Sequence, residues 1–244
     1  MTNLRLALIG AAGRMGQAIV GLAKSEGVEI IASIDLGHQL AFADAEVAID
    51  FSHADAAASI CEAAMKSQIP IVIGTTGHSA KQRDDIVAAS KEIPVVLASN
   101  FSVGVNALFA LTENVARILG DDFDLEIVEA HHRMKKDAPS GTAKTLAEIL
   151  HRARQTKILR HGREGIVGER GKSEIGVHSV RGGDVVGDHT VIFAGQGERL
   201  ELTHRASSRD TFARGAIRAA RWVIGKSPGL YDMMDVLGLR PEGG

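Results

Sequence analysis

The chain has 244 residues, of which 45% are hydrophobic and 24% charged, and its net charge is −2. This composition is typical of a globular protein with one large domain or two smaller ones, and we expect two. The balanced charge argues against a nucleic-acid partner, and aromatic residues at 4% leave little material for base stacking. The single cysteine, Cys61, excludes a disulfide framework within the chain. We expect a cytoplasmic protein with no signal peptide and no membrane span.

Apolar and β-branched runs alternate with helix-length segments through the first hundred residues. This alternation predicts an α/β fold in which helices cover a parallel sheet. The predicted strands are residues 5–10, 29–35, 47–52, 70–75 and 94–99.

A glycine-rich loop follows the first predicted strand. Its sequence is G-A-A-G-R-M-G, and it places Gly10, Gly13 and Gly16 at the start of a predicted helix. Such glycines let the backbone approach a pyrophosphate, while the helix N-terminus supplies amide donors. Asp35 ends the second strand, where an acid can bind the ribose hydroxyls. We therefore predict dinucleotide binding, and the alternative is a tight turn without a ligand.

Two further loops follow later strands of the same predicted sheet. They read G-T-T-G at 74–77 and A-S-N-F-S at 98–102. Ligands of open α/β sheets lie beyond the carboxyl ends of the strands, so we expect both loops to line the same crevice. Gly77 is better explained as part of a plain turn, and Phe101 could pack on a nicotinamide ring or fill a core.

The segment from Glu129 to Ala143 reads E-A-H-H-R-M-K-K-D-A-P-S-G-T-A. It lies between a predicted strand at 124–131 and a predicted helix at 142–151. Ser140 is a natural N-cap, and the amides of Ser140, Gly141 and Thr142 are expected to be available to a carboxylate or phosphate. A histidine titrating near neutrality can donate or accept a proton. The segment is therefore typical of a site that holds an anion and transfers protons.

The same segment carries the cations Arg133, Lys135 and Lys136. An amine close to a positive neighbour loses its proton more easily, so Lys135 beside Lys136 is a second candidate acid. The alternative is that the run is only a solvated face. We predict no metal site, because adjacent strand residues such as His131 and His132 point to opposite faces.

Together these motifs resemble the dihydrodipicolinate reductase family, also called the 4-hydroxy-tetrahydrodipicolinate reductases, of diaminopimelate and lysine synthesis. The resemblance also covers A-I-D-F-S at 48–52, A-S-N-F-S-V-G-V-N at 98–106, R-G-G-D-V-V-G-D-H-T-V at 181–191 and E-L-T-H-R-A-S-S-R at 201–209. The segment 129–143 is the most specific part of it.

The resemblance implies an NAD(P)H-dependent reduction of 4-hydroxy-tetrahydrodipicolinate to tetrahydrodipicolinate. It makes His131 the catalytic proton donor or acceptor and Lys135 a second proton donor. The choice of His131 over His132 rests on the resemblance alone. His132, Ser140, Gly141 and Thr142 would bind the dicarboxylate. The implied cofactor residues are Gly10, Ala11, Ala12, Gly13, Arg14, Met15, Asp35, Gly74, Thr75, Thr76, Ala98, Ser99, Asn100 and Phe101.

The family's fold implies a Rossmann-like, doubly wound domain with an inserted α+β domain for substrate binding and oligomerisation. The dinucleotide-binding domain would comprise residues 1–101 and 209–244, and residues 102–208 would form the inserted domain. A helix predicted at 209–225 would return the chain to the first domain. Strands predicted at 175–181, 185–194 and 198–205 would join a mixed sheet that mediates a homotetramer.

Two features separate the chain from many members of this family. The stretch between Asp35 and Val47 is short, and Leu36 replaces an arginine that can pair with the 2′-phosphate of NADPH. We therefore expect NADH to be preferred or fully competent, although Arg14 could still reach that phosphate. The remaining alternatives are a related reductase or dehydrogenase of another small carboxylic acid, and a dinucleotide sensor without turnover.

Overall fold

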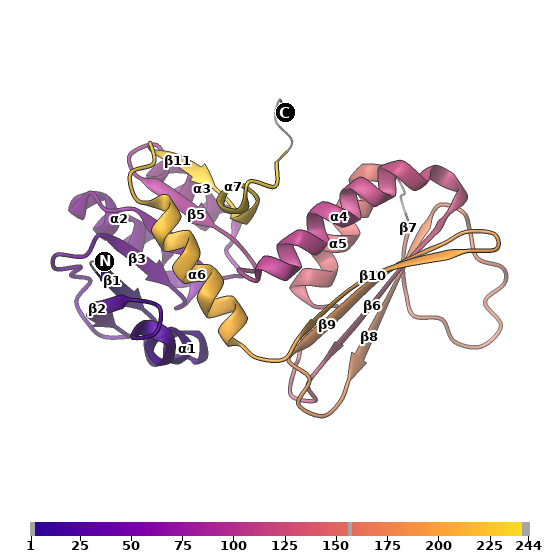
Figure 1. The fold of residues 1–244 in the computed structure, drawn as a ribbon, viewed down its shortest axis with the longest axis horizontal. Helices are drawn as coiled ribbons and strands as arrows, with labels where there is room; N and C mark the ends of the chain where they lie inside the picture. The colour runs from indigo at the N-terminus through magenta and orange to yellow at the C-terminus, as the bar shows by residue number, and fades with distance from the viewer. Residues whose placement is uncertain (1–2, 156–157, 241–244) are drawn as a thin grey trace. The chain divides into compact units, whose positions relative to one another are not determined.

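The structure is a computed structural model that describes residues 3–155 and 158–240. It contains two compact units, which are described separately. The first combines the chain up to Val103 with the chain from Arg209, and the second runs from Gly104 to Ser208 (Figure 1). The outermost residues of the ranges predicted for the first domain, 1–2 and 241–244, lie outside the described residues.

The first unit contains a six-stranded sheet with the order β11-β5-β4-β3-β1-β2. All of its pairings are parallel, as predicted. The chain passes from β1 to β2 on one side and then to β3 on the other side of β1, so the sheet is doubly wound. The strands are β1 (Leu4–Ile9), β2 (Val28–Ile34), β3 (Val47–Asp50), β4 (Ile71–Ile73), β5 (Pro94–Leu97) and β11 (Gly229–Tyr231).

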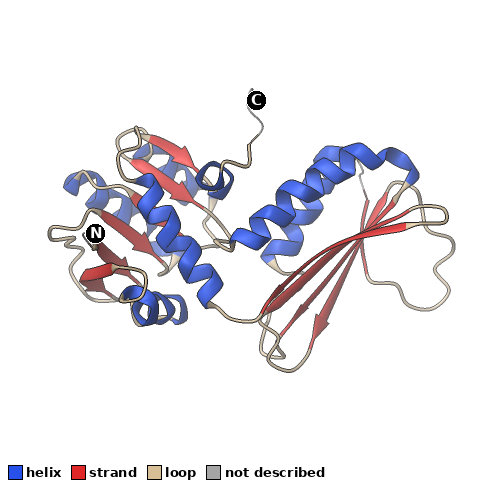
Figure 2. Ribbon diagram, viewed as in Figure 1, coloured by secondary structure: helices blue, strands red, loops and turns tan. Residues whose placement is uncertain are grey.

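Helices cover both faces of this sheet (Figure 2). Successive strand residues point to opposite faces, so Leu6 and Leu8 join one core cluster while Ala7 and Ile9 join the other. On the side of Leu6 lie α1 (Arg14–Ala23), α6 (Asp210–Val223) and α7 (Met233–Leu237), and on the side of Ala7 lie α2 (Ala57–Ser67) and α3 (Ala80–Ala89). A short 3-10 helix, η1 (Ala54–Ala56), precedes α2.

The second unit contains a five-stranded mixed sheet with the order β10-β9-β6-β8-β7. Its central strand, β6, pairs in parallel with β8 and antiparallel with β9. Leu125 and Ile127 of β6 pack on the helices of this unit, which share one core with the inner face of the sheet. The elements are α4 (Val103–Leu119), η2 (Gly120–Asp122), β6 (Asp124–His131), α5 (Gly141–Arg154), β7 (Ile158–His161), β8 (Glu174–Arg181), β9 (Gly187–Ala194) and β10 (Arg199–Ala206).

The predicted fold class is confirmed, and the predicted strand at 124–131 has the observed limits of β6. Other predicted elements exist with shifted ends: the helix predicted at 142–151 runs from Gly141 to Arg154, and the strand predicted at 185–194 begins at Gly187. No element is predicted from the sequence at α4, β7, β11 or α7. In the described part of the chain, no helix is both long and apolar enough to cross a membrane.

Candidate functional site

The glycine loop connects β1 to α1 in the first unit. Gly10 has a φ of +78°, and a Cβ there would lie 2.4 Å from the carbonyl oxygen of Phe51. A Cβ on Gly16 would lie 2.2 Å from the carbonyl oxygen of Gly10. Side chains therefore cannot be accommodated at these positions. Gly13 is the N-cap of α1 and provides no side-chain cap, so the helix begins with backbone donors suited to a phosphate.

Asp35 follows β2 and is joined to the glycine loop. The Ala12 amide donates to Asp35 Oδ1 at 3.0 Å and to Oδ2 at 3.2 Å. The Asp35 amide in turn donates to His38 Nδ1 at 3.2 Å. The carboxylate is thus fixed at the carboxyl end of the sheet beside the loop, which is where an acid can meet the ribose hydroxyls of a dinucleotide.

A cavity of about 620 Å³ opens at the same end of the sheet. Arg14 and Met15 of the glycine loop line it together with Gly74, Thr75 and Thr76 after β4. These residues come from distant parts of the sequence, and the parallel sheet brings them together. Ala11 is buried, and Ala12 and Gly13 are exposed on the same loop.

The loop after β5 supplies the remaining predicted cofactor residues. The Ala98 amide donates to the carbonyl of Ile73, and Asn100 Oδ1 accepts a hydrogen bond from the Ser102 amide. The side chain of Phe101 is 2% exposed and packs edge-to-face on Phe51 in the core. Of the two interpretations of Phe101, the structure favours a core side chain.

In the second unit, β6 carries Glu129 and His131 at its carboxyl end. Both lie on the inner face, in line with the buried Leu125 and Ile127. The Glu129 side chain is 0% exposed, and its Oε2 lies 2.5 Å from His131 Nδ1. A carboxylate and an imidazole are thus paired where the apolar core ends.

Glu129 is also held by two other elements. Arg181, which lies opposite His131 on β8, donates from Nη1 to Oε2 at 2.9 Å and from Nη2 to Oε1 at 2.7 Å. The Ser140 amide donates to Oε1 at 3.2 Å. Our expectation that this amide is available to an anion was therefore wrong, because Glu129 already uses it. Ser140 is nevertheless the N-cap of α5, since its Oγ accepts a hydrogen bond from the Ala143 amide.

A third histidine, His189 of β9, completes the cluster. Its Nε2 lies 3.0 Å from Ser140 Oγ, and its ring meets that of His131 at a centroid distance of 5.2 Å. Its Nδ1 is buried and has no hydrogen-bond partner within residues 3–155 and 158–240. Burial and the neighbouring His131 lower the pKa of His189 to about 3, so this ring is neutral at pH 7.

The charges of this cluster determine its protonation states. Burial alone would raise the pKa of Glu129, but hydrogen bonds from Arg181, Ser179 and His131 outweigh burial and bring that pKa to about 2. Glu129 is therefore a carboxylate at neutral pH. Burial lowers the pKa of His131, and the hydrogen bond and charge of Glu129 partly restore it.

The loop after β6 holds Lys135 and His132. Lys135 Nζ donates to Asp137 Oδ1 at 2.8 Å, so its direct partner is an anion rather than the cation Lys136 that the sequence predicts beside it. The His132 amide donates to the carbonyl of Val185 at 2.7 Å. Gly141 and Thr142 form the first turn of α5. The structure thus gathers all predicted substrate residues around the carboxyl end of β6 and the start of α5.

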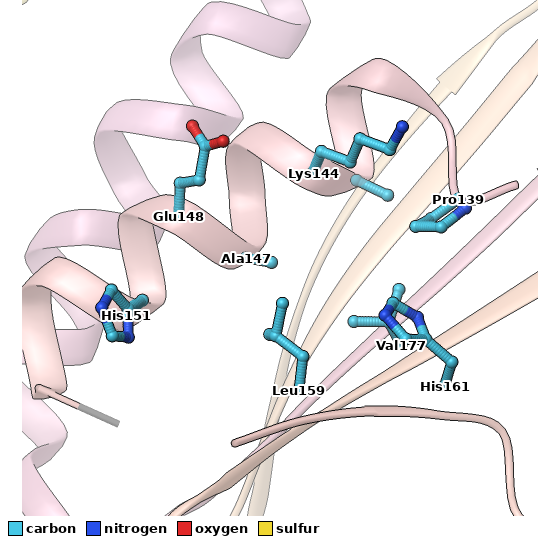
Figure 3. Close-up of a pocket in the computed structure, with 9 residues that line it drawn as sticks. Pro139, Lys144, Ala147, Glu148, His151, Leu159, His161 and Val177 are labelled. Atoms are coloured by element: carbon cyan, nitrogen blue, oxygen red, sulfur yellow. The ribbon is translucent and has the colours of Figure 1, made fainter. Parts of the chain in front are cut away.

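A second cavity, of about 290 Å³, lies beside α5 in the same unit (Figure 3). Pro139 and Lys144 stand near one end of it, with His151, Leu159 and His161 among its other lining residues. None of the predicted substrate residues lines this cavity, which is therefore separate from the candidate site. Within the described residues, no group of three or more His, Cys, Asp and Glu side chains could hold a metal ion.

A doubly wound sheet with a glycine loop, together with a mixed-sheet unit carrying a carboxylate–histidine pair, is the architecture of a dinucleotide-dependent oxidoreductase. Family models described as dihydrodipicolinate reductase, N-terminus, and dihydrodipicolinate reductase, C-terminus, match residues 4–101 and 104–237. The chain belongs to the dihydrodipicolinate reductase family, which confirms the resemblance seen in the sequence. It is an NAD(P)H-dependent reductase of diaminopimelate and lysine synthesis.

Individual relatives agree with this assignment. The chain is 55% identical to a 4-hydroxy-tetrahydrodipicolinate reductase of Akkermansia muciniphila, covering 97% of this chain and 98% of the relative. It is 47% identical to the enzyme of the same name from Geobacter metallireducens, covering 97% and 100%. A solved structure of dipicolinate-bound dihydrodipicolinate reductase from Paenisporosarcina sp. TG-14 shares the fold, with a TM-score of 0.75, 24% identity and coverage of 96% and 99%.

Glu129, Arg181, His189 and Asp50 have no predicted role from the sequence. A signal existed for Glu129, because residues two apart on a strand share a face and Glu129 is two residues before His131. Arg181 and His189 join the cluster because of the register in which β8 and β9 pair with β6. Their positions in the sequence do not indicate this register. Asp50 is 1% exposed at the end of an apolar strand, and a buried acid in such a run is itself a signal.

Proposed function

We propose that the chain reduces 4-hydroxy-tetrahydrodipicolinate to tetrahydrodipicolinate, with the cofactor bound by the first unit and the substrate by the second. The relatives that match the whole chain carry this activity in their names, and the related solved structure holds dipicolinate, a planar ring dicarboxylate. The carboxylate–histidine pair of Glu129 and His131 beside the start of α5 is the observation that carries the proposal. It combines a proton donor with an anion-binding helix terminus.

The residues around the first cavity fit a dinucleotide. Gly10 and Gly16 leave no room for side chains, so the loop packs closely on the carboxyl end of the sheet, and Asp35 lies beside the loop where it can bind the ribose. A bound nicotinamide would supply the hydride. The proposed contacts are Gly10, Ala11, Ala12, Gly13, Arg14, Met15, Asp35, Gly74, Thr75, Thr76, Ala98, Ser99, Asn100 and Phe101, the last through its backbone because its side chain is buried.

The residues after β6 fit a dicarboxylate that must gain a proton. Reduction at C4 of the dehydrated ring leaves an enamine that needs a proton at C3. His131 holds a proton that Glu129 helps to retain, and Lys135 is a second donor. His132, Gly141 and Thr142 would bind the carboxylates directly, and Ser140 would contribute as the cap that orients the amides of Gly141 and Thr142.

NADH is the proposed preferred cofactor. The Asp35 carboxylate at the glycine loop would repel a 2′-phosphate, and the fully exposed Leu36 beside it offers no charge to pair with one. Arg14, exposed on the glycine loop, is the residue that could still bind that phosphate.

We further propose a cytoplasmic homotetramer that assembles through the outer face of the mixed sheet. Along β6 and β9 every second residue is only half-buried within one chain, including Val128, Thr190 and Ile192. A second copy would bury this face. Sedimentation velocity measures the assembly directly, and a monomer at micromolar concentration would contradict it.

A single assay tests the activity. NADH oxidation is followed after addition of enzymatically generated 4-hydroxy-tetrahydrodipicolinate, with pyruvate and oxaloacetate as control substrates. We expect turnover with the first compound only, and a reduction in kcat of about 10²- to 10⁴-fold in His131→Gln. Turnover of a control acid instead would indicate another carboxylic-acid reductase, and cofactor binding without any turnover would indicate a sensor.

A further inference from the structure

We propose that Glu129 is a positioning residue that serves both halves of the substrate site. Its carboxylate orients the His131 imidazole through Nδ1 and, through the Ser140 amide, fixes the start of the helix that receives the substrate carboxylate. This inference rests on the proposed function. It assigns a role to a residue that acts through its contacts with His131 and Ser140.

The contacts of Glu129 fix its carboxylate in one orientation. Arg181 binds both oxygens through hydrogen bonds of 2.9 and 2.7 Å, and this bidentate contact restrains the orientation of the carboxylate. One oxygen then faces His131 and the other faces the Ser140 amide. Arg181 itself is anchored, since its Nη2 also donates to the carbonyl of Asp137 at 2.8 Å.

The orientation of Glu129 determines which nitrogen of His131 can react. Because Glu129 is ionised and can only accept, His131 Nδ1 carries a hydrogen in both charge states of the ring. Proton transfer must therefore occur at Nε2. A Cβ on Gly187 would lie 3.1 Å from this nitrogen, so the glycine keeps space open beside the reacting atom.

The same carboxylate supports the anion-binding end of α5. The Ser140 amide is held by Glu129, while Ser140 Oγ caps the Ala143 amide and contacts His189 Nε2. Gly141 and Thr142 lie between these two attachments and begin the helix. A shift of the Glu129 carboxylate would therefore move the proton donor and the anion-binding amides together.

The groups that face His131 come from every element around it. Glu129 of β6 is the anion, while Lys135 after β6, Arg181 of β8 and His189 of β9 are the cationic or neutral neighbours. Lys135 and Arg181 add to the effect of burial in lowering the pKa of His131, and Glu129 opposes them. Without the carboxylate, the pKa of His131 falls further. If the reaction needs protonated His131, activity then declines at a lower pH in the variant than in the wild type as the pH is raised.

The test compares Glu129→Gln with Glu126→Gln in the full-length protein. Glu126 lies on the same strand and is also bound by arginines, but it faces the opposite side of the sheet. For Glu129→Gln we expect kcat to fall by about 10- to 100-fold and the alkaline limb of the kcat/KM profile to move to lower pH. Glu126→Gln should leave that limb in place. An unmoved limb in Glu129→Gln overturns the proposal.

A second readout does not depend on turnover. Imidazole ¹⁵N NMR of the wild type, assigned with His131→Gln, should show Nδ1 protonated and Nε2 unprotonated above the pKa of His131. In Glu129→Gln this preference should weaken and the titration should move to lower pH. If Glu129→Gln does not fold, Glu129→Asp replaces it, because the shorter carboxylate cannot reach His131 and Arg181 together. Unchanged His131 signals overturn the positioning role, whereas failure of the wild type to reduce the substrate overturns only the proposed function.

Discussion

The Thr75 hydroxyl donates a hydrogen bond of 2.7 Å to Asp50 Oδ2 and so joins the ends of two neighbouring strands. The other carboxylate oxygen, Oδ1, accepts from both the amide and the hydroxyl of Ser52, at 2.9 and 2.5 Å. Ser52 and Thr75 line the first cavity, whereas Asp50 is buried behind them. Asp50 therefore holds two walls of the proposed cofactor site in register.

Asp50→Asn should weaken cofactor binding. The Asn side chain has one acceptor oxygen and an NH₂ group in place of two carboxylate oxygens, so Thr75 and Ser52 cannot both continue to donate to it as they donate to Asp50. We expect the Kd for NADH to rise by about tenfold, in line with the loss of about one hydrogen bond to a charged group. Isothermal titration calorimetry measures this change. Ser52→Ala is the matched control, because it removes one hydroxyl donor but keeps the carboxylate, and its effect should be smaller. Equal affinities of Asp50→Asn and wild type would contradict the role of Asp50.

The parallel sheet and the glycine loop were predictable because their signals are local. A strand, a glycine turn and a helix follow one another within residues 4–23, and each of these signals strengthens the interpretation of the next. Helix α4 was predictable in principle, since Val105, Leu108, Phe109, Thr112 and Ala116 follow helical spacing and are all buried.

The contacts around Glu129 depend on register between distant strands. Arg181 reaches Glu129 because β8 pairs with β6 such that Arg181 lies opposite His131, and His189 lies opposite Glu129 on β9. A shift of one residue would turn each of these side chains to the other face. The sequence therefore identified the histidines and the helix cap but not the carboxylate that joins them.

Lys135→Ala should impair both catalysis and substrate binding. If the amine is both an acid and an anion contact, its loss lowers kcat and raises KM for the substrate, together about 100-fold in kcat/KM. Lys136→Ala is the matched control, because Lys136 is exposed and adjacent and carries the same charge. Steady-state kinetics at fixed saturating NADH separates the two parameters. Similar effects of both variants would favour the alternative in which the basic run is only a solvated face.

Leu36→Arg should shift cofactor preference toward NADPH. An arginine at this fully exposed position next to Asp35 can form a bidentate pair with the 2′-phosphate. A charge-assisted contact of about 1.5 kcal/mol corresponds to a gain of about tenfold in the NADPH to NADH ratio of kcat/KM. Leu36→Gln introduces polarity without charge and should leave the ratio near that of the wild type. A wild-type enzyme that already prefers NADPH strongly would refute our cofactor proposal, and equal gains in both variants would show that charge is not the cause.

Glu126 binds Arg163 and Arg170, two residues of the segment before β8, on the outer face of the mixed sheet. Arg163 donates to both of its oxygens, at 3.1 and 2.8 Å, and Arg170 Nε donates to Oε1 at 3.0 Å. His178 Nε2 lies 2.8 Å from Oε2. Burial alone would raise the pKa of Glu126, but hydrogen bonds from Arg163, His178 and Arg170 prevail and lower that pKa to about 2.

Glu126→Gln should therefore destabilise the second unit in a pH-dependent way. Because the folded-state pKa lies below the ordinary value of 4.5, the stabilisation is fully present above pH 4.5 and is lost as the pH falls toward 2. We expect the variant to lose about 2 kcal/mol in the free energy of unfolding at pH 7. Urea denaturation of the wild type and Glu126→Gln at several pH values measures the difference between their free energies of unfolding. The contributions of the other carboxyl groups cancel in this difference. Asp124→Asn, which removes only one partner of Arg170, should cost less. A difference that stays constant or grows between pH 4.5 and pH 2 would show that the Glu126 carboxylate does not supply this stabilisation.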